Sequence, residues 1–383
     1  MKVLYIVGGE GNRYGSEIIA IELISLGKTY GIEFTVVTAN KGAVTKVCDD
    51  LDIPNYSVPF RFFVYKPHNN PLLNLGKKFL WRCRAEFLTH RAVHYIEKHI
   101  NIKSFDIIHT NLSRDLIGGI LSEKYNLPHV WHIHELFKAH YQLSFLKSKQ
   151  VEWMSAHADM FVSISNTVAD DWRRNGLPSN KITTIYNGID LDSIVSKKEY
   201  GVNEKLKIVM VGHLVSSKGQ DAVIKKLAHI SDSIKQKIIF DCIGDGAEDY
   251  KKYLLHLSAE HKISFNLLGY NQNVGGILKD YDIGINCSRG EGFGLTTIEY
   301  MVAGLCPIVA NTGANEEIIE NQHNGFVFDF NDDYSLSSVV EYLYGHRDIL
   351  ESVSRSAQKD ALAKYSVDRM AAEVFKLYHC LNK

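Results

Sequence analysis

Hydrophobic and polar positions follow two patterns along this chain. Short, apolar, β-branched runs of strand length alternate with longer segments in which apolar residues recur every three or four positions, as they do along one face of a helix. This alternation is typical of parallel β-sheets covered by helices, so the chain is predicted to belong to the α/β class. The pattern occurs twice, once in each half of the chain.

The apolar runs give the predicted strands and their boundaries. In the first half they are Lys2–Val7, Phe34–Thr38, Ile107–His109, His129–His134, Met160–Ile164 and Ile182–Tyr186. In the second half they are Lys207–Val211, Lys237–Ile243, Ser264–Leu268, Asp282–Cys287, Cys306–Ala310 and Phe326–Phe328.

The segment between the halves, residues 187–205, is polar and rich in turn formers, which indicates a linker. We therefore expect two Rossmann-like, doubly wound parallel-sheet domains, an N-terminal one over 1–190 and a C-terminal one over 203–365. Ligands of such sheets bind at the carboxyl ends of strands. Function is thus expected in the loops that follow the strands, which would face a cleft between the domains.

Composition narrows the class of function. The 383 residues carry a formal net charge of -1 and give no overall reason to expect a nucleic acid partner. No stretch reaches the roughly 18 apolar residues of a membrane-spanning helix. Six scattered cysteines without a C-x-x-C pair suit a reducing cytoplasm, where most would fill cores, and make a zinc site unlikely. We expect a cytoplasmic location.

The densest loop follows the predicted strand 282–287 and contains three glycines within residues 290–294. The chain then takes up a helical period, so the amides of about Gly294 to Thr297 form a helix N-terminus that attracts an anion such as a diphosphate. Glu291 precedes this helix and Glu299 lies within it, where two carboxylates can bind hydroxyls of a sugar and a ribose. The alternative is a glycine-rich turn with two solvated glutamates.

The stretch from Glu291 to Val309 resembles the E-x7-E signature of retaining glycosyltransferase family 4, down to Gly304 and Pro307. The similarity extends over nearly the whole chain, at residues 186–190, 211–219, 243–246, 268–270, 313–318 and 324–325. It implies the two-domain GT-B fold, in which the last helix, about 366–383, packs back on the N-terminal domain. It also implies a retaining, hexosyltransferase-type enzyme that uses a nucleotide-sugar.

The resemblance implies a role for individual residues. Glu299 would hold the nucleotide ribose, Glu291 the donor sugar, and Lys218 the diphosphate. The implied donor-binding set is Gly15, His213, Lys218, Tyr270, Glu291, Gly292, Phe293, Gly294, Leu295, Thr296 and Glu299. The residues expected to act in the chemistry are His134, Glu291 and Lys218, with Glu291 positioning the donor and not acting as a nucleophile.

His213 departs from the family pattern, which usually has arginine at this position. Imidazole cannot offer the bidentate fork of a guanidinium, so His213 would donate one hydrogen bond, another cation would substitute, or donor binding would be weak. Arg289 is a candidate substitute, although a structural surface role is the simpler interpretation.

In the first half, the period of two in a strand puts His132 and His134 on one face. An H-x-H pair can bind zinc, but no third ligand has a suitable spacing. His132 is more simply a core histidine with satisfied hydrogen bonds, and the resemblance makes His134 an active-site residue. The loop 8–15 resembles the family's first glycine-rich loop, and Gly15 is assigned to close approach of donor phosphate or acceptor. A dinucleotide fingerprint is the rival interpretation, but its spacing is poor.

The family likeness implies front-face displacement, with the leaving phosphate taking the acceptor proton. No cofactor and no divalent metal are then required, and the acids Asp329, Asp332 and Asp333 are interpreted as a turn and helix cap. The expected partners are a UDP- or GDP-sugar donor and a glycan or lipid-linked saccharide acceptor, in cell-surface polysaccharide biosynthesis such as that of capsule or lipopolysaccharide. Two alternatives are a non-catalytic nucleotide-sugar-binding protein and a sugar-nucleotide epimerase of the same fold.

Residues 59–99 mix aromatic and basic side chains. They are Phe60, Arg61, Phe62, Phe63, Tyr65, Lys66, Lys77, Lys78, Phe79, Trp81, Arg82, Arg84 and Arg91. This mixture suits an anionic membrane surface, so one hypothesis is peripheral contact with the inner face of the cytoplasmic membrane. The other is that the aromatics are core and the cations a solvated helix face.

Overall fold

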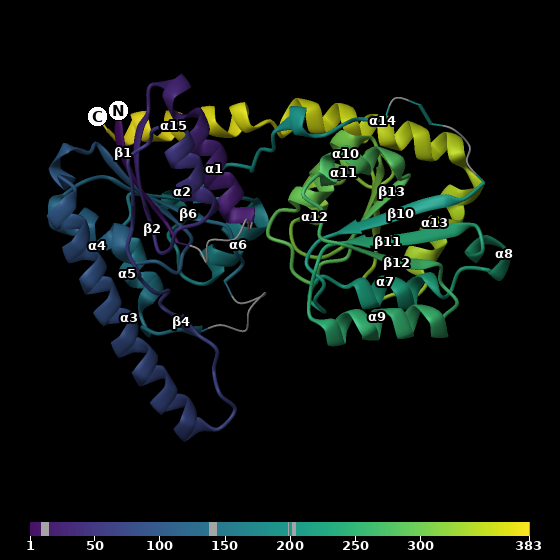
Figure 1. The fold of residues 1–383 in the computed structure, drawn as a ribbon, viewed down its shortest axis with the longest axis horizontal. Helices are drawn as coiled ribbons and strands as arrows, with labels where there is room; N and C mark the ends of the chain where they lie inside the picture. The colour runs from purple at the N-terminus through teal and green to yellow at the C-terminus, as the bar shows by residue number, and fades with distance from the viewer. Residues whose placement is uncertain (9–14, 138–143, 198, 201–203, 383) are drawn as a thin grey trace. The chain divides into compact units, whose positions relative to one another are not determined.

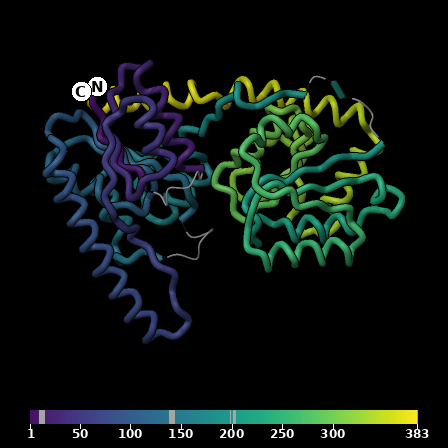
Figure 2. The backbone as a smooth tube through the Cα atoms, in the orientation of Figure 1, coloured from purple at the N-terminus to yellow at the C-terminus, as the bar shows by residue number. Residues whose placement is uncertain are grey.

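The structure is a computed structural model that describes residues 1–383 except 9–14, 138–143, 198, 201–203 and 383 (Figure 1). The chain divides into two compact units. Unit 1 comprises Met1–Gly188 and Val367–Lys383, and unit 2 comprises Ile189–Ser366. Each unit is built on a sheet with helices packed against it (Figures 1 and 2).

The sheet of unit 1 has seven strands in the order β3-β2-β1-β5-β6-β8-β9. All neighbouring strands in it are parallel. The strands are β1 (Lys2–Val7), β2 (Glu33–Thr38), β3 (Asn55–Ser57), β5 (Ile107–Asn111), β6 (His129–Ile133), β8 (Met160–Ser163) and β9 (Ile182–Thr184). The order reverses between β1 and β5, which makes the loops after these two strands the expected ligand site.

The helices of unit 1 connect these strands. They are α1 (Gly15–Gly27), α2 (Ala43–Asp50), α3 (Pro71–His99), α4 (Ile117–Tyr125), α5 (Gln150–Ala156) and α6 (Asn166–Arg174). A separate antiparallel pair is formed by β4 (Val64–Tyr65) and β7 (Ser144–Phe145).

The last helix, α15 (Val367–Leu381), packs within unit 1 beside α1. It buries Met370, Ala371, Val374, Phe375 and Tyr378. The Arg369 guanidinium donates a 2.6 Å hydrogen bond to the Tyr186 carbonyl, which joins the first turn of α15 to the end of the N-terminal segment.

The sheet of unit 2 has six strands in the order β12-β11-β10-β13-β14-β15, and neighbouring strands are again parallel. The strands are β10 (Leu206–Val211), β11 (Ile238–Ile243), β12 (Phe265–Gly269), β13 (Ile283–Asn286), β14 (Cys306–Ala310) and β15 (Phe326–Phe328). The helices are α7 (Gln220–Leu227), α8 (Asp232–Lys235), α9 (Glu248–Glu260), α10 (Val274–Ile277), α11 (Leu295–Ala303), α12 (Asn315–Ile318), α13 (Ser335–Gly345) and α14 (Arg347–Lys364). The order reverses between β10 and β13.

The predicted fold class, two parallel-sheet α/β units of the GT-B type, is confirmed. Of the six cysteines, Cys48, Cys242, Cys287 and Cys306 are buried as expected, whereas Cys83 and Cys380 are exposed. Among the described residues, no helix is both long and apolar enough to span a membrane.

Candidate active site

Two of the residues expected to bind the donor lie in unit 2 on the two loops where the strand order reverses. The loop after β10 carries Lys218, and the loop after β13 carries Glu291. Because β10 and β13 are neighbours, these side chains meet although 73 residues separate them, and Lys218 Nζ lies 3.2 Å from Glu291 Oε2. The Glu291 side chain is 14% exposed and that of Lys218 37% exposed. The residue expected to bind the diphosphate, Lys218, is therefore paired with the residue expected to bind the sugar, Glu291.

Close backbone contacts bring the two loops together. Gly219 has a left-handed φ of 86°, and a side chain there would place Cβ 2.4 Å from the Cys287 carbonyl oxygen. Gly313, in the loop after β14, lies against Glu291 in the same manner, and Ala314 N donates a 2.9 Å hydrogen bond to the Glu291 carbonyl. The loop that carries Glu291 is thus held by the loops on both sides of it.

The helix that follows the loop provides an anion site. Helix α11 begins at Leu295, and Gly294 precedes it with a φ of 105°, a conformation that favours glycine. The amides of Gly294, Leu295 and Thr296 donate no hydrogen bond within the described part of the chain, because Thr297 N is the first to bond, to the Gly294 carbonyl at 2.9 Å. These amides and the positive end of the helix dipole favour a bound anion.

Gly292 and Phe293, which precede these amides, are both buried. The Phe293 side chain is 2% exposed and packs edge-on against Tyr365, with ring centroids 5.9 Å apart. Both residues therefore belong to the packed base of the loop, and only their main chain can face a ligand.

Glu299 is partly buried on α11, and its carboxyl makes no hydrogen bond or ion pair with any residue that the structure describes. Burial raises the pKa of this carboxyl to about 7, because a charged group loses hydration there. The neighbouring Tyr300 hydroxyl accepts a 2.7 Å hydrogen bond from Val211 N, which ties α11 to the end of β10. A partly buried carboxyl whose oxygens have no partner among the described residues is suited to accept hydrogen bonds from the hydroxyl groups of a ligand.

The other predicted donor residues lie at the ends of neighbouring strands. His213 follows β10 and is exposed, and its ring has no hydrogen bond among the described residues. Tyr270 follows β12 and is 68% exposed, and the preceding Gly269 accepts a 2.9 Å hydrogen bond from Gly244 N. Arg289 Nε donates to the Ser216 carbonyl at 3.3 Å, so this guanidinium is held on the loop that carries Lys218.

In unit 1, His134 lies at the end of β6, beside the end of β5. His134 Nε2 is 2.7 Å from Asn111 Oδ1. Asn111 Nδ2 donates to the Ser16 carbonyl at 3.1 Å, which turns the amide oxygen toward the imidazole. His134 Nε2 therefore carries the hydrogen and Nδ1 the lone pair. Burial, with smaller effects from His132 and His109, holds the pKa of His134 well below its usual value, so this ring is neutral.

His132 is buried as predicted, but its hydrogen bonds are not satisfied. Neither ring nitrogen has a partner within the described ranges, and burial lowers the pKa of His132 to about 3. The ring stacks between those of His109 and His134, at centroid distances of 5.4 and 4.2 Å. His109 in turn bonds the Tyr378 hydroxyl of α15. Among the described residues, no group of three or more His, Cys, Asp or Glu side chains could hold a metal ion.

A polar cluster after β5 was not predicted. Glu135 Oε1 accepts hydrogen bonds from the Ser113 amide and hydroxyl and lies 3.5 Å from Arg114 Nε. Asp115 is buried, its Oδ2 has no partner among the described residues, and burial raises its pKa to about 7. The signal was available, since a run of polar residues directly follows a predicted strand, but the predicted strand ended at His109 and not at Asn111.

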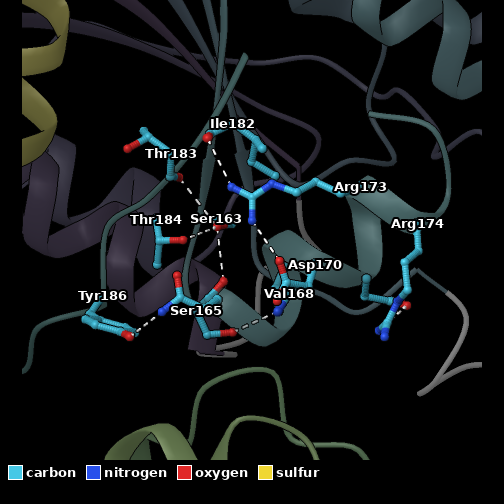
Figure 3. A network of polar contacts seen from close by, with 12 residues as sticks. Ser163, Ser165, Val168, Asp170, Arg173, Arg174, Ile182, Thr183, Thr184 and Tyr186 are labelled. Atoms are coloured by element: carbon cyan, nitrogen blue, oxygen red, sulfur yellow. Dashed lines mark hydrogen bonds and ion pairs between the residues drawn. The ribbon is translucent and has the colours of Figure 1, made fainter. Parts of the chain in front are cut away.

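The carboxyl end of β8 carries a second missed network (Figure 3). Ser163 Oγ donates to the Ser165 carbonyl at 3.1 Å, and the Ser165 hydroxyl accepts from Val168 N at 3.0 Å and caps α6. Asn166 Nδ2 donates to the Tyr186 hydroxyl at 2.8 Å. These bonds join the end of β8 to the segment after β9.

Gly15 is exposed at the start of α1, and the rest of its predicted loop, residues 9–14, is outside the described residues.

Comparisons with known proteins identify the family. Residues 15–193 match Glycosyltransferase Family 4, and residues 193–360 match Glycosyl transferases group 1. The UDP-Gal:alpha-D-GlcNAc-diphosphoundecaprenol alpha-1,3-galactosyltransferase of Escherichia coli is 23% identical over 310 residues, which are 73% of this chain and 77% of that protein. HepE of Anabaena, solved in complex with UDP, superposes with a TM-score of 0.81 at 19% identity and covers 100% of both chains. A glycosyltransferase from Rickettsia africae superposes with a TM-score of 0.77 at 18% identity and covers 100% of this chain and 98% of its own. The predicted family is confirmed, and the chain belongs to the GT-B glycosyltransferases of the family 4 type.

Proposed function

We propose that the protein transfers a sugar, with retention of anomeric configuration, from a UDP- or GDP-sugar to a hydroxyl of a glycan or lipid-linked saccharide in cell-surface polysaccharide biosynthesis. The observation that carries this proposal is the Lys218–Glu291 pair beside the acceptor-free amides of α11. A cation, a helix N-terminus and two carboxyls are what a sugar diphosphate requires. HepE was solved with UDP and with UDP-glucose, which supports a nucleotide-sugar donor.

Each donor group has a complementary partner in unit 2. The diphosphate takes Lys218, the amides of residues 293–296 and one hydrogen bond from His213. The ribose takes Glu299, the sugar hydroxyls take Glu291, and the base lies by Tyr270. Because donor phosphates would draw Lys218 away from Glu291, binding would exchange the Lys218 contact of the Glu291 carboxylate for contacts with the sugar.

The proposed reaction is a front-face displacement. The bond between the anomeric carbon and the phosphate oxygen breaks, and the nucleoside diphosphate leaves with the electron pair. The acceptor oxygen forms its bond on the same face, and its proton passes to the departing phosphate oxygen. Lys218 and the α11 dipole stabilise the charge that develops on the leaving group. This route requires neither a cofactor nor a divalent metal.

In unit 1 we assign His134 to the acceptor side of the reaction and Gly15 to close approach of donor phosphate or acceptor. Neutral His134 presents the Nδ1 lone pair, which can accept a hydrogen bond from a hydroxyl. The Escherichia coli relative is named for an acceptor linked to diphosphoundecaprenol, which supports a lipid-linked acceptor and work at the inner face of the cytoplasmic membrane.

A thermal-shift screen against UDP- and GDP-sugars tests donor binding, with Glu299→Gln as the matched variant. We expect one nucleotide-sugar to raise the melting temperature of the wild-type protein and the variant to lose most of that shift. The anomeric configuration of the product, read by NMR, then tests retention. Binding without turnover would favour a non-catalytic binding protein, and isomerisation of the donor without an acceptor would favour an epimerase.

A further inference from the structure

Helix α3 of unit 1 is only partly packed. All of its buried residues, Ala85, Thr89, Ala92, Val93 and Ile96, lie in its second half. Residues 71–84 include no buried side chain, and the first half of the helix extends beyond the rest of unit 1 (Figures 1 and 2). Asn70 caps its start by accepting hydrogen bonds from Leu72 N and Leu73 N, so the projecting part begins as an ordered helix.

The projecting half of α3 and the turn that follows it expose large apolar side chains. Leu72 is 82% exposed, Leu75 68%, Phe79 65%, Leu80 68% and Phe87 62%. Leu72, Phe79, Leu80 and Phe87 recur at helical spacing and form one continuous stripe. The period of 3.6 residues turns this stripe to nearly the opposite side of the helix from the buried row. Its apolar groups therefore face away from the body of unit 1.

Cations border this stripe. Residues 71–91 contain five Lys or Arg and a single acid, Glu86, which is paired with Arg82 at 3.0 Å. Arg84 and Arg91 are exposed, and Arg91 lies over the Phe87 ring at 5.7 Å. The earlier aromatics of the predicted stretch behave differently, because Phe60, Phe63 and Tyr65 are buried. The interpretation that the aromatics are core is thus confirmed for Phe60, Phe63 and Tyr65, and it is wrong for Phe79 and Phe87 of α3.

We propose that the exposed face of α3 over residues 72–91 is a docking surface for an anionic lipid bilayer, with the stripe entering the headgroup region and the flanking cations contacting acidic headgroups. Excess positive charge beside exposed apolar residues is complementary to such a membrane. A second copy of the chain is a poorer occupant, since the two stripes would bring like charges together. The inference deepens the proposed function by naming where a lipid-linked acceptor is met, but it does not depend on sugar transfer.

Sedimentation with phosphatidylcholine vesicles, with and without phosphatidylglycerol, tests this proposal on the full chain without donor or acceptor. We expect binding to the anionic vesicles that weakens with salt. Each cation near an anionic surface contributes about fivefold to the partition constant, so Arg84→Gln/Arg91→Gln should weaken binding roughly 25-fold. Leu72→Gln/Phe79→Gln/Leu80→Gln should weaken it at least as much.

Matched controls carry the same changes elsewhere. Leu255→Gln/Leu362→Gln alters two leucines of unit 2 that are each 48% exposed, and Lys252→Gln/Lys359→Gln removes two exposed cations. Neither should alter vesicle binding. Exposed Cys83 also lies on the stripe, so an environment-sensitive dye attached there after Cys380→Ser should shift to the blue on anionic vesicles.

Wild-type protein that stays unbound at low salt, or α3 variants that bind like the controls, would overturn the proposal. So would a wild-type dimer in light scattering that the triple variant abolishes without any vesicle binding. The nucleotide-sugar thermal shift of the α3 variants should equal that of the wild type, which separates failure of the membrane surface from failure of the donor site.

Discussion

Replacing Lys218 with methionine should separate chemistry from stability. The chain length is kept, but the cation is lost. The Lys218–Glu291 pair is part-exposed, and pairs of this kind contribute at most about 1 kcal/mol to folding. Loss of a group that stabilises developing charge costs about 3–4 kcal/mol in the transition state, or roughly 10²–10³ in kcat. We therefore expect a large fall in kcat and almost no change in the free energy of unfolding.

The assay measures release of nucleoside diphosphate with the donor found in the screen, and calorimetry measures unfolding. Calorimetry is needed because all four tryptophans, Trp81, Trp131, Trp153 and Trp172, lie in unit 1, so their fluorescence does not report on unit 2. Lys218→Arg keeps the charge and should recover part of the activity. Lys364→Met is the control, since Lys364 pairs with Asp360 at the same 3.2 Å on α14. A fall in kcat below tenfold, or a stability loss above about 2 kcal/mol, would refute the assigned role.

Two further predictions concern a loop contact in unit 2 and the core of unit 1. Gly313→Ala would place Cβ 2.2 Å from the Glu291 carbonyl oxygen at a φ of 62°, so calorimetry should show unit 2 destabilised by more than about 2 kcal/mol, and the thermal shift caused by the donor should be smaller. In the control, Gly345→Ala, the new Cβ meets nothing within 4 Å and stability should not change. Equal effects of the two substitutions would contradict the contact between Gly313 and the Glu291 backbone. The unfolded chain protonates His132 below pH about 6.5, whereas the folded form does so only near 3, so stability falls as pH drops through this window by up to about 1.4 kcal/mol per pH unit. In urea unfolding followed by tryptophan fluorescence at pH 7 and 5, His132→Leu should show a shallower pH dependence than the wild type, and identical slopes would exclude this titration.

Most strands were readable from local pattern. Buried parallel strands are continuous apolar runs, and Cys306–Ala310 and Phe326–Phe328 were predicted at their observed ends. The three-residue β3 and the two-residue β4 and β7 were not predicted, because so few residues show no period. The end of β5 was placed too early, since Thr110 and Asn111 are polar although fully buried.

Local periodicity and contiguous motifs were enough to predict the α/β class, the glycine-rich loop and the family. Tertiary structure decided which distant side chains meet. Lys218 and Glu291 pair only because β10 and β13 are adjacent, and the residues of a single strand do not specify the order of strands in the sheet. It also decided that Phe63 is core while Phe79 faces solvent, since burial depends on what packs against a residue and not on the residue itself.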